Sequence, residues 1–165
     1  QNLRINVATG ATILDGTLNQ ASGSPFIVAS AYTNSFAGAT TTTLYNIDSN
    51  SDMLTIQTPP NNGTQVMVGS LGMDVTALAG MDILTVGSTN TAYAALQTAG
   101  TTGSKFAMIN LATGTATVIG NISMNQSSDS LAVRDIAVTA VPEPATMTAL
   151  ALGLAAMLRR RRAAK

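Results

Sequence analysis

Three residue types that carry much of enzyme chemistry are missing from this chain of 165 residues, namely cysteine, histidine and tryptophan. Without cysteine the chain has no disulfide, no thiolate metal ligand and no thiol nucleophile. Without histidine or cysteine, the common hydrolytic triads cannot be built. Only three tyrosines and three phenylalanines are present, which leaves few rings for the exposed aromatic platforms that usually bind sugars.

Charge is also sparse, at 10% of residues, and it is unevenly placed. Most cations lie after residue 158, so residues 1–140 carry three cations against seven aspartates, a net charge of about −4. The basic surface of a nucleic-acid-binding protein is therefore absent, and we expect no nucleic-acid partner. The chain opens at Gln1 within a predicted strand, with neither an initiator Met nor a signal peptide. We therefore expect an N-terminally truncated or processed product.

The end of the chain has three segments in order: a linker at 141–144, an apolar run at 145–158 and an Arg-rich end at 159–165. Pro142 and Pro144 lack an N–H donor and hold the residues before them in extended geometry. The leucines, methionines and alanines that follow predict a hydrophobic α-helix. At ~1.5 Å per residue this helix spans roughly 21 Å, less than the ~30 Å of a hydrocarbon core.

This geometry predicts a marginal and temporary membrane anchor. Thinning of the bilayer and snorkelling of the arginines would close part of the gap. The positive-inside rule places the arginines in the cytoplasm and residues 1–140 outside. The alternatives are an ordinary tail anchor or an amphipathic helix docked on the domain, and docking is disfavoured because the run is apolar on all faces.

The order of Pro-Glu-Pro, short apolar helix and arginine block resembles the PEP-CTERM sorting signal of Gram-negative bacteria that make extracellular polysaccharide. The resemblance implies recognition by an exosortase, an integral-membrane cysteine transpeptidase, after transient anchoring in the inner membrane. It further implies release to the cell surface or to an extracellular biofilm matrix. The residues of the implied sorting and cleavage motif are Val141, Pro142, Glu143 and Pro144. The residues expected to fix membrane orientation are Arg159, Arg160, Arg161 and Arg162.

A short pattern recurs three times before the tail, at residues 5–10, 47–52 and 109–114. It reads Ile, then Asn or Asp, two variable positions, Thr or Ser, and finally Gly or Asp. Asn and Asp bond their own backbone in turns, and Gly tolerates positive φ. Each copy therefore predicts the turn of a β-hairpin, and we expect the three turns to be equivalent. In the second hairpin we expect the returning strand at 65–69, after a loop insertion at 58–63.

Further apolar strands are predicted at 26–32, 81–84, 91–96 and 134–138. They complete units of about four strands: an inner strand with Asp-Ile, a strand with Tyr, then the hairpin. The pattern recurs after about 40 and about 60 residues, a spacing typical of propeller blades. We therefore predict an all-β domain over residues 1–140, built of repeated four-stranded antiparallel units and partly propeller-like. A β-sandwich is the alternative.

Residues 1–6, 31–36 and 44–48 resemble the C-terminal half of a bacterial domain-of-unknown-function family. That family is propeller-like and often precedes PEP-CTERM tails. Because it has no established activity, the resemblance implies no catalytic residue. It also implies that further blades are missing here, and the edges of a partial propeller invite pairing with another chain.

One stretch has the start of a metal-binding loop. Asp48, Asn50 and Asp52 have the Asp-x-Asn-x-Asp spacing of a calcium loop. The complete loop needs a Gly next and a Glu at its twelfth position, where Met53 and Pro59 stand instead. We interpret the stretch as a turn, with a weak calcium site as the alternative, and we expect no cofactor.

Paired carboxylates for glycoside cleavage are the remaining candidate chemistry. The available aspartates are Asp74, Asp82, Asp129 and Asp135. Nothing in their spacing brings two of them together. Asp82 and Asp135 occupy equivalent predicted strands, where they either line a channel or, as we favour, cap backbone N–H groups.

Two classes of function remain. The first is a non-catalytic exported surface or matrix protein that binds extracellular polysaccharide or an envelope protein. The second is a carbohydrate-active enzyme that uses a pair of aspartates. We favour the first, and therefore expect that the protein is not an enzyme.

Overall fold

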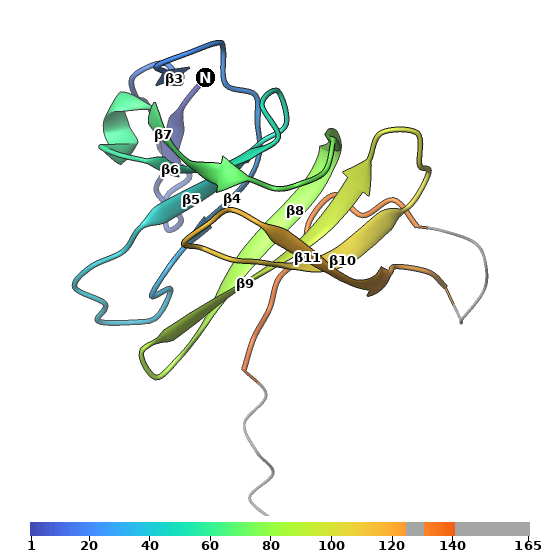
Figure 1. The fold of residues 1–165 in the computed structure, drawn as a ribbon. Coiled ribbons are helices and arrows are strands. Elements are labelled where there is room, and N and C mark those ends of the chain that lie inside the picture. Colours follow the sequence, from blue (N-terminus) through green and yellow to red (C-terminus); the bar gives the residue numbers. More distant parts are fainter. Residues whose placement is uncertain (125–130, 141–165) are drawn as a thin grey trace, which may run out of the picture.

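The structure is a computed structural model that describes residues 1–124 and 131–140. These residues form three open β-sheets (Figure 1), and a single 3-10 helix, η1 (Pro60–Asn62), is the only helical element among them. The predicted all-β class is confirmed. None of the three sheets is closed, and the partly propeller-like arrangement stays a prediction.

The four-stranded sheet confirms one predicted unit. Its strands are β8 (Val75–Val86), β9 (Thr89–Thr98), β10 (Ser104–Ile109) and β11 (Ala116–Asn121). Strands that follow one another in the chain are antiparallel neighbours, in the order β11-β10-β9-β8. As predicted, Asp82 lies in the first strand, Tyr93 in the second, and the repeated turn joins the last two.

The five-stranded sheet has the order β3-β7-β6-β5-β4. Its strands are β3 (Asn19–Gln20), β4 (Ile27–Tyr32), β5 (Leu44–Asp48), β6 (Met53–Gln57) and β7 (Thr64–Ser70). The predicted return strand of the second hairpin is wrong, because β6 pairs with β5 as soon as the turn ends, with Asp48 opposite Met53. Residues 65–69 belong to β7, the partner of β6, and the 58–63 loop connects these two strands.

A small hairpin of β1 (Leu3–Ile5) and β2 (Thr12–Leu14) is attached to the five-stranded sheet by polar contacts. The Asn2 side chain donates to the Pro60 carbonyl at 2.9 Å, and the Gly16 N–H donates to the Asn61 carbonyl at 2.9 Å. Within the hairpin, Arg4 donates two hydrogen bonds to Asp15, at 2.7 and 2.9 Å. This carboxylate raises the pKa of Arg4, so the guanidinium stays charged.

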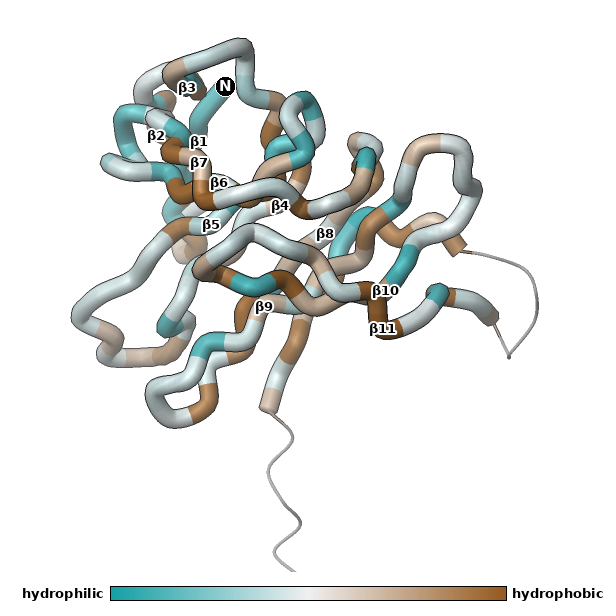
Figure 2. Tube along the Cα trace, in the orientation of Figure 1, coloured by the Kyte–Doolittle hydropathy of each residue, from teal (hydrophilic) through white to brown (hydrophobic). Residues whose placement is uncertain are grey.

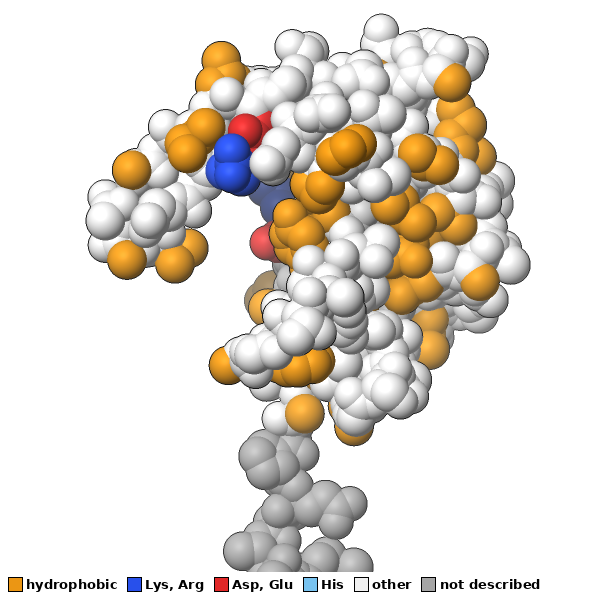
Figure 3. All heavy atoms as spheres, turned by 90° about the vertical axis from the view of Figure 1, so that its left-hand side faces the viewer, with side chains coloured by type: hydrophobic (Ala, Val, Ile, Leu, Met, Phe, Trp, Pro, Cys, Tyr) orange, Lys and Arg blue, Asp and Glu red, His pale blue; other side chains and the backbone are white. Residues whose placement is uncertain are grey.

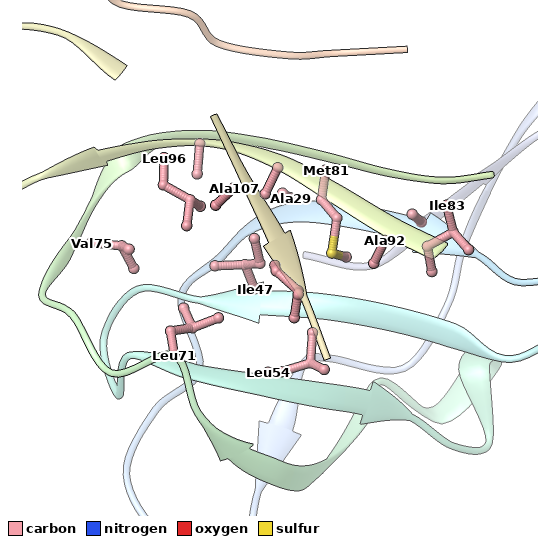
Figure 4. Packing of buried hydrophobic residues seen from close by; sticks show 14 residues of the cluster. Ala29, Ile47, Leu54, Leu71, Val75, Met81, Ile83, Ala92, Leu96 and Ala107 are labelled. Atoms are coloured by element: carbon pink, nitrogen blue, oxygen red, sulfur yellow. The ribbon is translucent and has the colours of Figure 1, made fainter. Parts of the chain in front are cut away.

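The two larger sheets pack face to face and share one apolar core (Figure 4). Ile47 and Leu54 project from β5 and β6 toward Met81 and Leu96 of β8 and β9. Six of the ten other buried residues of this core are alanines, and β4 lies against β8. The core alanines are Ala29, Ala31, Ala79, Ala92, Ala94 and Ala107. Such small side chains allow the two backbones to approach closely.

The segment 134–138 is not a strand, which corrects the sequence prediction. It passes the edge of β8 so closely that a β-carbon at Gly80 would overlap the Asp135 backbone. Its Val138 N–H donates to the Asp82 carboxylate at 2.8 Å instead of to a backbone carbonyl. The segment is thus held to β8 by a side chain, so no strand ladder forms.

The three repeated turns are structurally equivalent, as predicted. In each, the Oδ1 of the Asn or Asp accepts the backbone N–H two residues on, at 2.9, 3.0 and 2.9 Å for Asn6, Asp48 and Asn110. Each turn ends on a residue with positive φ. These residues are Gly10 at 73°, Asp52 at 55° and Gly114 at 82°.

Gly114 meets a second constraint that its counterparts lack. A β-carbon at this position would overlap the backbone of Gly69 in β7, whereas a β-carbon at Gly10 would meet nothing within 4 Å. Next to this contact, the Ala116 N–H donates to the Leu71 carbonyl at 3.1 Å. The third turn is therefore docked on the other sheet, and glycine is needed there for space as well as for φ.

The paired substitutions Gly114→Val and Gly10→Val separate these two demands. Each forces a β-branched residue into positive φ, at a cost of about 1–2 kcal/mol. Gly114→Val must also displace β7, so we expect it to lower the free energy of unfolding by at least about 1 kcal/mol more than Gly10→Val. Urea denaturation of both variants measures the difference, and equal midpoints would show that the contact with Gly69 is unimportant.

Candidate functional site

The stretch that we interpret as a turn, with a weak calcium site as the alternative, forms a hydrogen-bonded turn. Asp48 is fully buried, and its Oδ1 accepts the backbone N–H groups of Phe26 and Asn50 at 2.8 and 3.0 Å. Its Oδ2 accepts the Ser51 hydroxyl at 2.6 Å. The Asp48 carboxylate therefore fastens the start of β4 to the turn between β5 and β6.

The other two candidate ligands bond elsewhere. Asp52 accepts the Val75 N–H at 2.8 Å, and the Asn50 side chain donates to the Ser24 carbonyl at 2.8 Å. The three side chains thus bond three different segments. Within the described ranges there is also no cluster of three or more His, Cys, Asp or Glu side chains that could hold a metal.

Two of the aspartates considered for glycoside cleavage, Asp82 and Asp135, bond backbone N–H groups, and Asp74 stands directly before β8. Asp82 accepts the Ile83 N–H through Oδ1 and the Val138 N–H through Oδ2, both at 2.8 Å. Asp135 accepts the Ile136 N–H at 2.8 Å, and Asp129 lies outside the described residues. An acid or nucleophile needs a carboxylate oxygen that faces substrate. Both aspartates act as caps of backbone N–H groups, which is the role we favoured.

A hollowed surface that we did not predict from the sequence lies at the loop between β4 and β5. The β4–β5 hollow has a volume of about 600 Å³ and contains two aromatic rings, Tyr32 and Phe36. A second hollow of about 370 Å³ lies between the same loop and the β8–β9 turn, and Phe36 lines it as well. Figure 1 shows these two loops at the same end of the sheets.

The lining of both hollows is uncharged. Apart from the two rings it consists of Asn, Ser and Thr with small Ala and Gly residues. In Figure 2 most of the β4–β5 loop is of intermediate hydropathy. Figure 3 shows the side of the molecule that is on the left in Figure 1, and few charged side chains are visible on it. Tyr32 and Phe36 are 44% and 54% exposed, so both rings are accessible to a ligand.

Asn34 holds the β4–β5 loop in place. Its backbone N–H donates to Thr85 Oγ1 and Asn90 Oδ1, each at 3.1 Å, which ties the loop to the β8–β9 hairpin. Its side chain donates to the Thr41 carbonyl at 2.9 Å across the loop. Asn34 has a φ of 53°, a conformation that Asn tolerates better than most residues. The loop is therefore pre-formed.

The motif residues 141–144, the expected helix at 145–158 and the arginines all lie outside the described residues. Within the described part of the chain, no helix has the length and apolar character needed to cross a membrane.

Comparison with known protein families finds a match for the β-domain and another for the tail. The PEP-CTERM protein-sorting motif matches residues 140–162, which makes this an exported protein that an exosortase processes. Residues 1–137 match the family described as Domain of unknown function (DUF4394), and the chain belongs to this family. Both resemblances inferred from the sequence are confirmed. No curated protein and no solved structure matches the chain.

Asp48 provides a test of the turn against the calcium site. Asp48→Ala removes three hydrogen bonds from buried or partly buried groups, so we expect a loss of about 2–4 kcal/mol in the free energy of unfolding. Asp48→Asn keeps an acceptor at Oδ1 and should lose less. The thermal midpoint of the unmodified protein should be the same in EDTA and in micromolar calcium. A calorimetric titration with micromolar affinity would contradict the turn interpretation.

Proposed function

We propose that this chain is a non-catalytic binding protein of the cell surface or extracellular matrix, with a binding domain at 1–140 and a sorting tail at 141–165. The observation that carries the proposal is the sorting motif directly after a β-domain. The engagement of Asp82 and Asp135 by backbone N–H groups supports a role without catalysis. The domain's partner is extracellular polysaccharide or an envelope protein.

In this proposal the arginine block first stops the tail in the membrane, and the Pro-Glu-Pro segment is then presented to the exosortase. Each arginine costs roughly 3 kcal/mol at the centre of the bilayer, so the block at 159–162 cannot follow the domain across the membrane. The short helix is then held with its N-terminal end near the outer face of the inner membrane. Pro142 and Pro144 keep Glu143 in extended geometry there, open to the transpeptidase.

Replacing Glu143 tests the sorting mechanism. Glu143→Ala removes the charge that the exosortase recognises, so the full-length chain should stay in the membrane fraction of a polysaccharide-producing host. Thr146→Ala, in the same tail but outside the 141–144 linker that carries Pro-Glu-Pro, should be shortened and released like the parent. Immunoblots of membrane and secreted fractions report the result, and normal release of Glu143→Ala would rule out this mechanism.

Retention in the matrix tests the binding role separately. In a host that makes extracellular polysaccharide, the released protein should stay with the matrix after washing. In a host that makes no extracellular polysaccharide but retains its envelope proteins, it should be lost to the medium. Equal retention in both hosts would assign the binding to an envelope protein. Loss to the medium in both would contradict a binding role.

A further inference from the structure

We infer that the β4–β5 hollow and the adjoining hollow at the β8–β9 turn form one binding site for a neutral polysaccharide. This inference rests on the proposed function and narrows it from a binding protein to a ligand class and a site.

The lining of the site matches the two-sided chemistry of a sugar ring. A pyranose has an apolar face of C–H groups and a rim of hydroxyls. Exposed Tyr32 and Phe36 offer flat apolar surfaces for that face. Ser35 and Thr42 line the same hollow with hydroxyl groups, which both donate and accept hydrogen bonds. A few polar groups around an apolar surface are the usual composition of a ligand site.

The absence of charge in the lining selects among polysaccharides. None of the residues that line either hollow is a Lys, Arg, Asp or Glu. A uronic acid or a phosphorylated sugar would lose hydration on entry without gaining a counter-charge, which is unfavourable. A neutral sugar has no such cost, so the ligand is a neutral polymer.

The position of Phe36 indicates a chain rather than a single sugar. Phe36 lines both hollows together with Asn34, Gly38 and Ala39. The ring therefore stands between two adjoining spaces, and successive units of an extended glycan can occupy one on each side. Gly38 has no side chain and Ala39 has only a methyl group, so neither adds bulk where the two hollows share their lining.

The fixed loop lowers the cost of binding. Asn34 is bonded to Thr85 and Asn90 in the neighbouring hairpin and to Thr41 within the loop. Phe36 donates its N–H to the Asn34 carbonyl at 2.8 Å, so its backbone is positioned by the same node. Little conformational freedom is then lost when a ligand binds.

A titration series with matched aromatic variants tests the site. The purified full chain, in a zwitterionic detergent without a sugar head group, is titrated by calorimetry with dextran, laminarin and cellohexaose as neutral probes. Alginate serves as the acidic probe. Tyr32→Ala and Phe36→Ala remove the proposed rings. Phe26→Ala is the control, because Phe26 is 57% exposed but lies before β4, at the end away from Tyr32, and lines neither hollow.

We expect binding of at least one neutral probe, weakened at least tenfold by Tyr32→Ala and by Phe36→Ala and unchanged by Phe26→Ala. The affinity should be insensitive to salt, because no charge is involved. Binding of alginate alone, no binding of any neutral probe, or neutral binding that survives both ring variants would overturn the site. Retention in the matrix with no effect of the ring variants would overturn the site while leaving the proposed function intact.

Discussion

The close approach of the two larger sheets is the constraint on which the rest of the structure depends. Alanines occupy much of the shared core, and the backbones of Gly69 and Gly114 touch where β7 meets the third turn. Small side chains bury little apolar area each, at about 25 cal/mol per Å². Hydrogen-bonded groups, the Asn and Asp turns among them, therefore contribute to the specificity of the fold.

Hydrogen-bonded polar side chains are also buried on the other face of the five-stranded sheet. The Asn46 side chain donates to Gln57 and Gln65 at 3.1 and 2.9 Å, and the Thr55 hydroxyl donates to Gln65 at 2.7 Å. The Gln57 side chain donates to the Pro60 carbonyl at 2.6 Å, in the loop that also receives Asn2. Most of these buried polar atoms bond one another, although Asn46 Oδ1 has no hydrogen-bond partner among the described residues. The cluster also ties the N-terminal hairpin to the sheet.

Sorting and recognition are placed in different parts of the chain. The sorting motif lies beyond the β-domain, at residues 140–162. The proposed glycan site lies on two loops at one end of the packed sheets, where binding residues are commonly found on a rigid scaffold. The same core that keeps the sheets close also brings the β4–β5 loop against the β8–β9 turn.

The sequence alone determined the features that depend on neighbouring residues. The turns at Asn6, Asp48 and Asn110 follow from side chains that bond their own backbone. The β8–β11 unit follows from the strand pattern and the spacing of the turns. The sorting motif is recognised as a linear segment. Tertiary structure decided where distant segments meet. The 134–138 segment is predicted as a strand, yet its backbone lies against Gly80 of β8, where no β-carbon excludes it, and its Val138 N–H bonds the Asp82 side chain. The hollow around Tyr32 and Phe36 likewise lies on a loop whose Asn34 bonds Thr85 and Asn90, and the local sequence pattern does not predict that pairing.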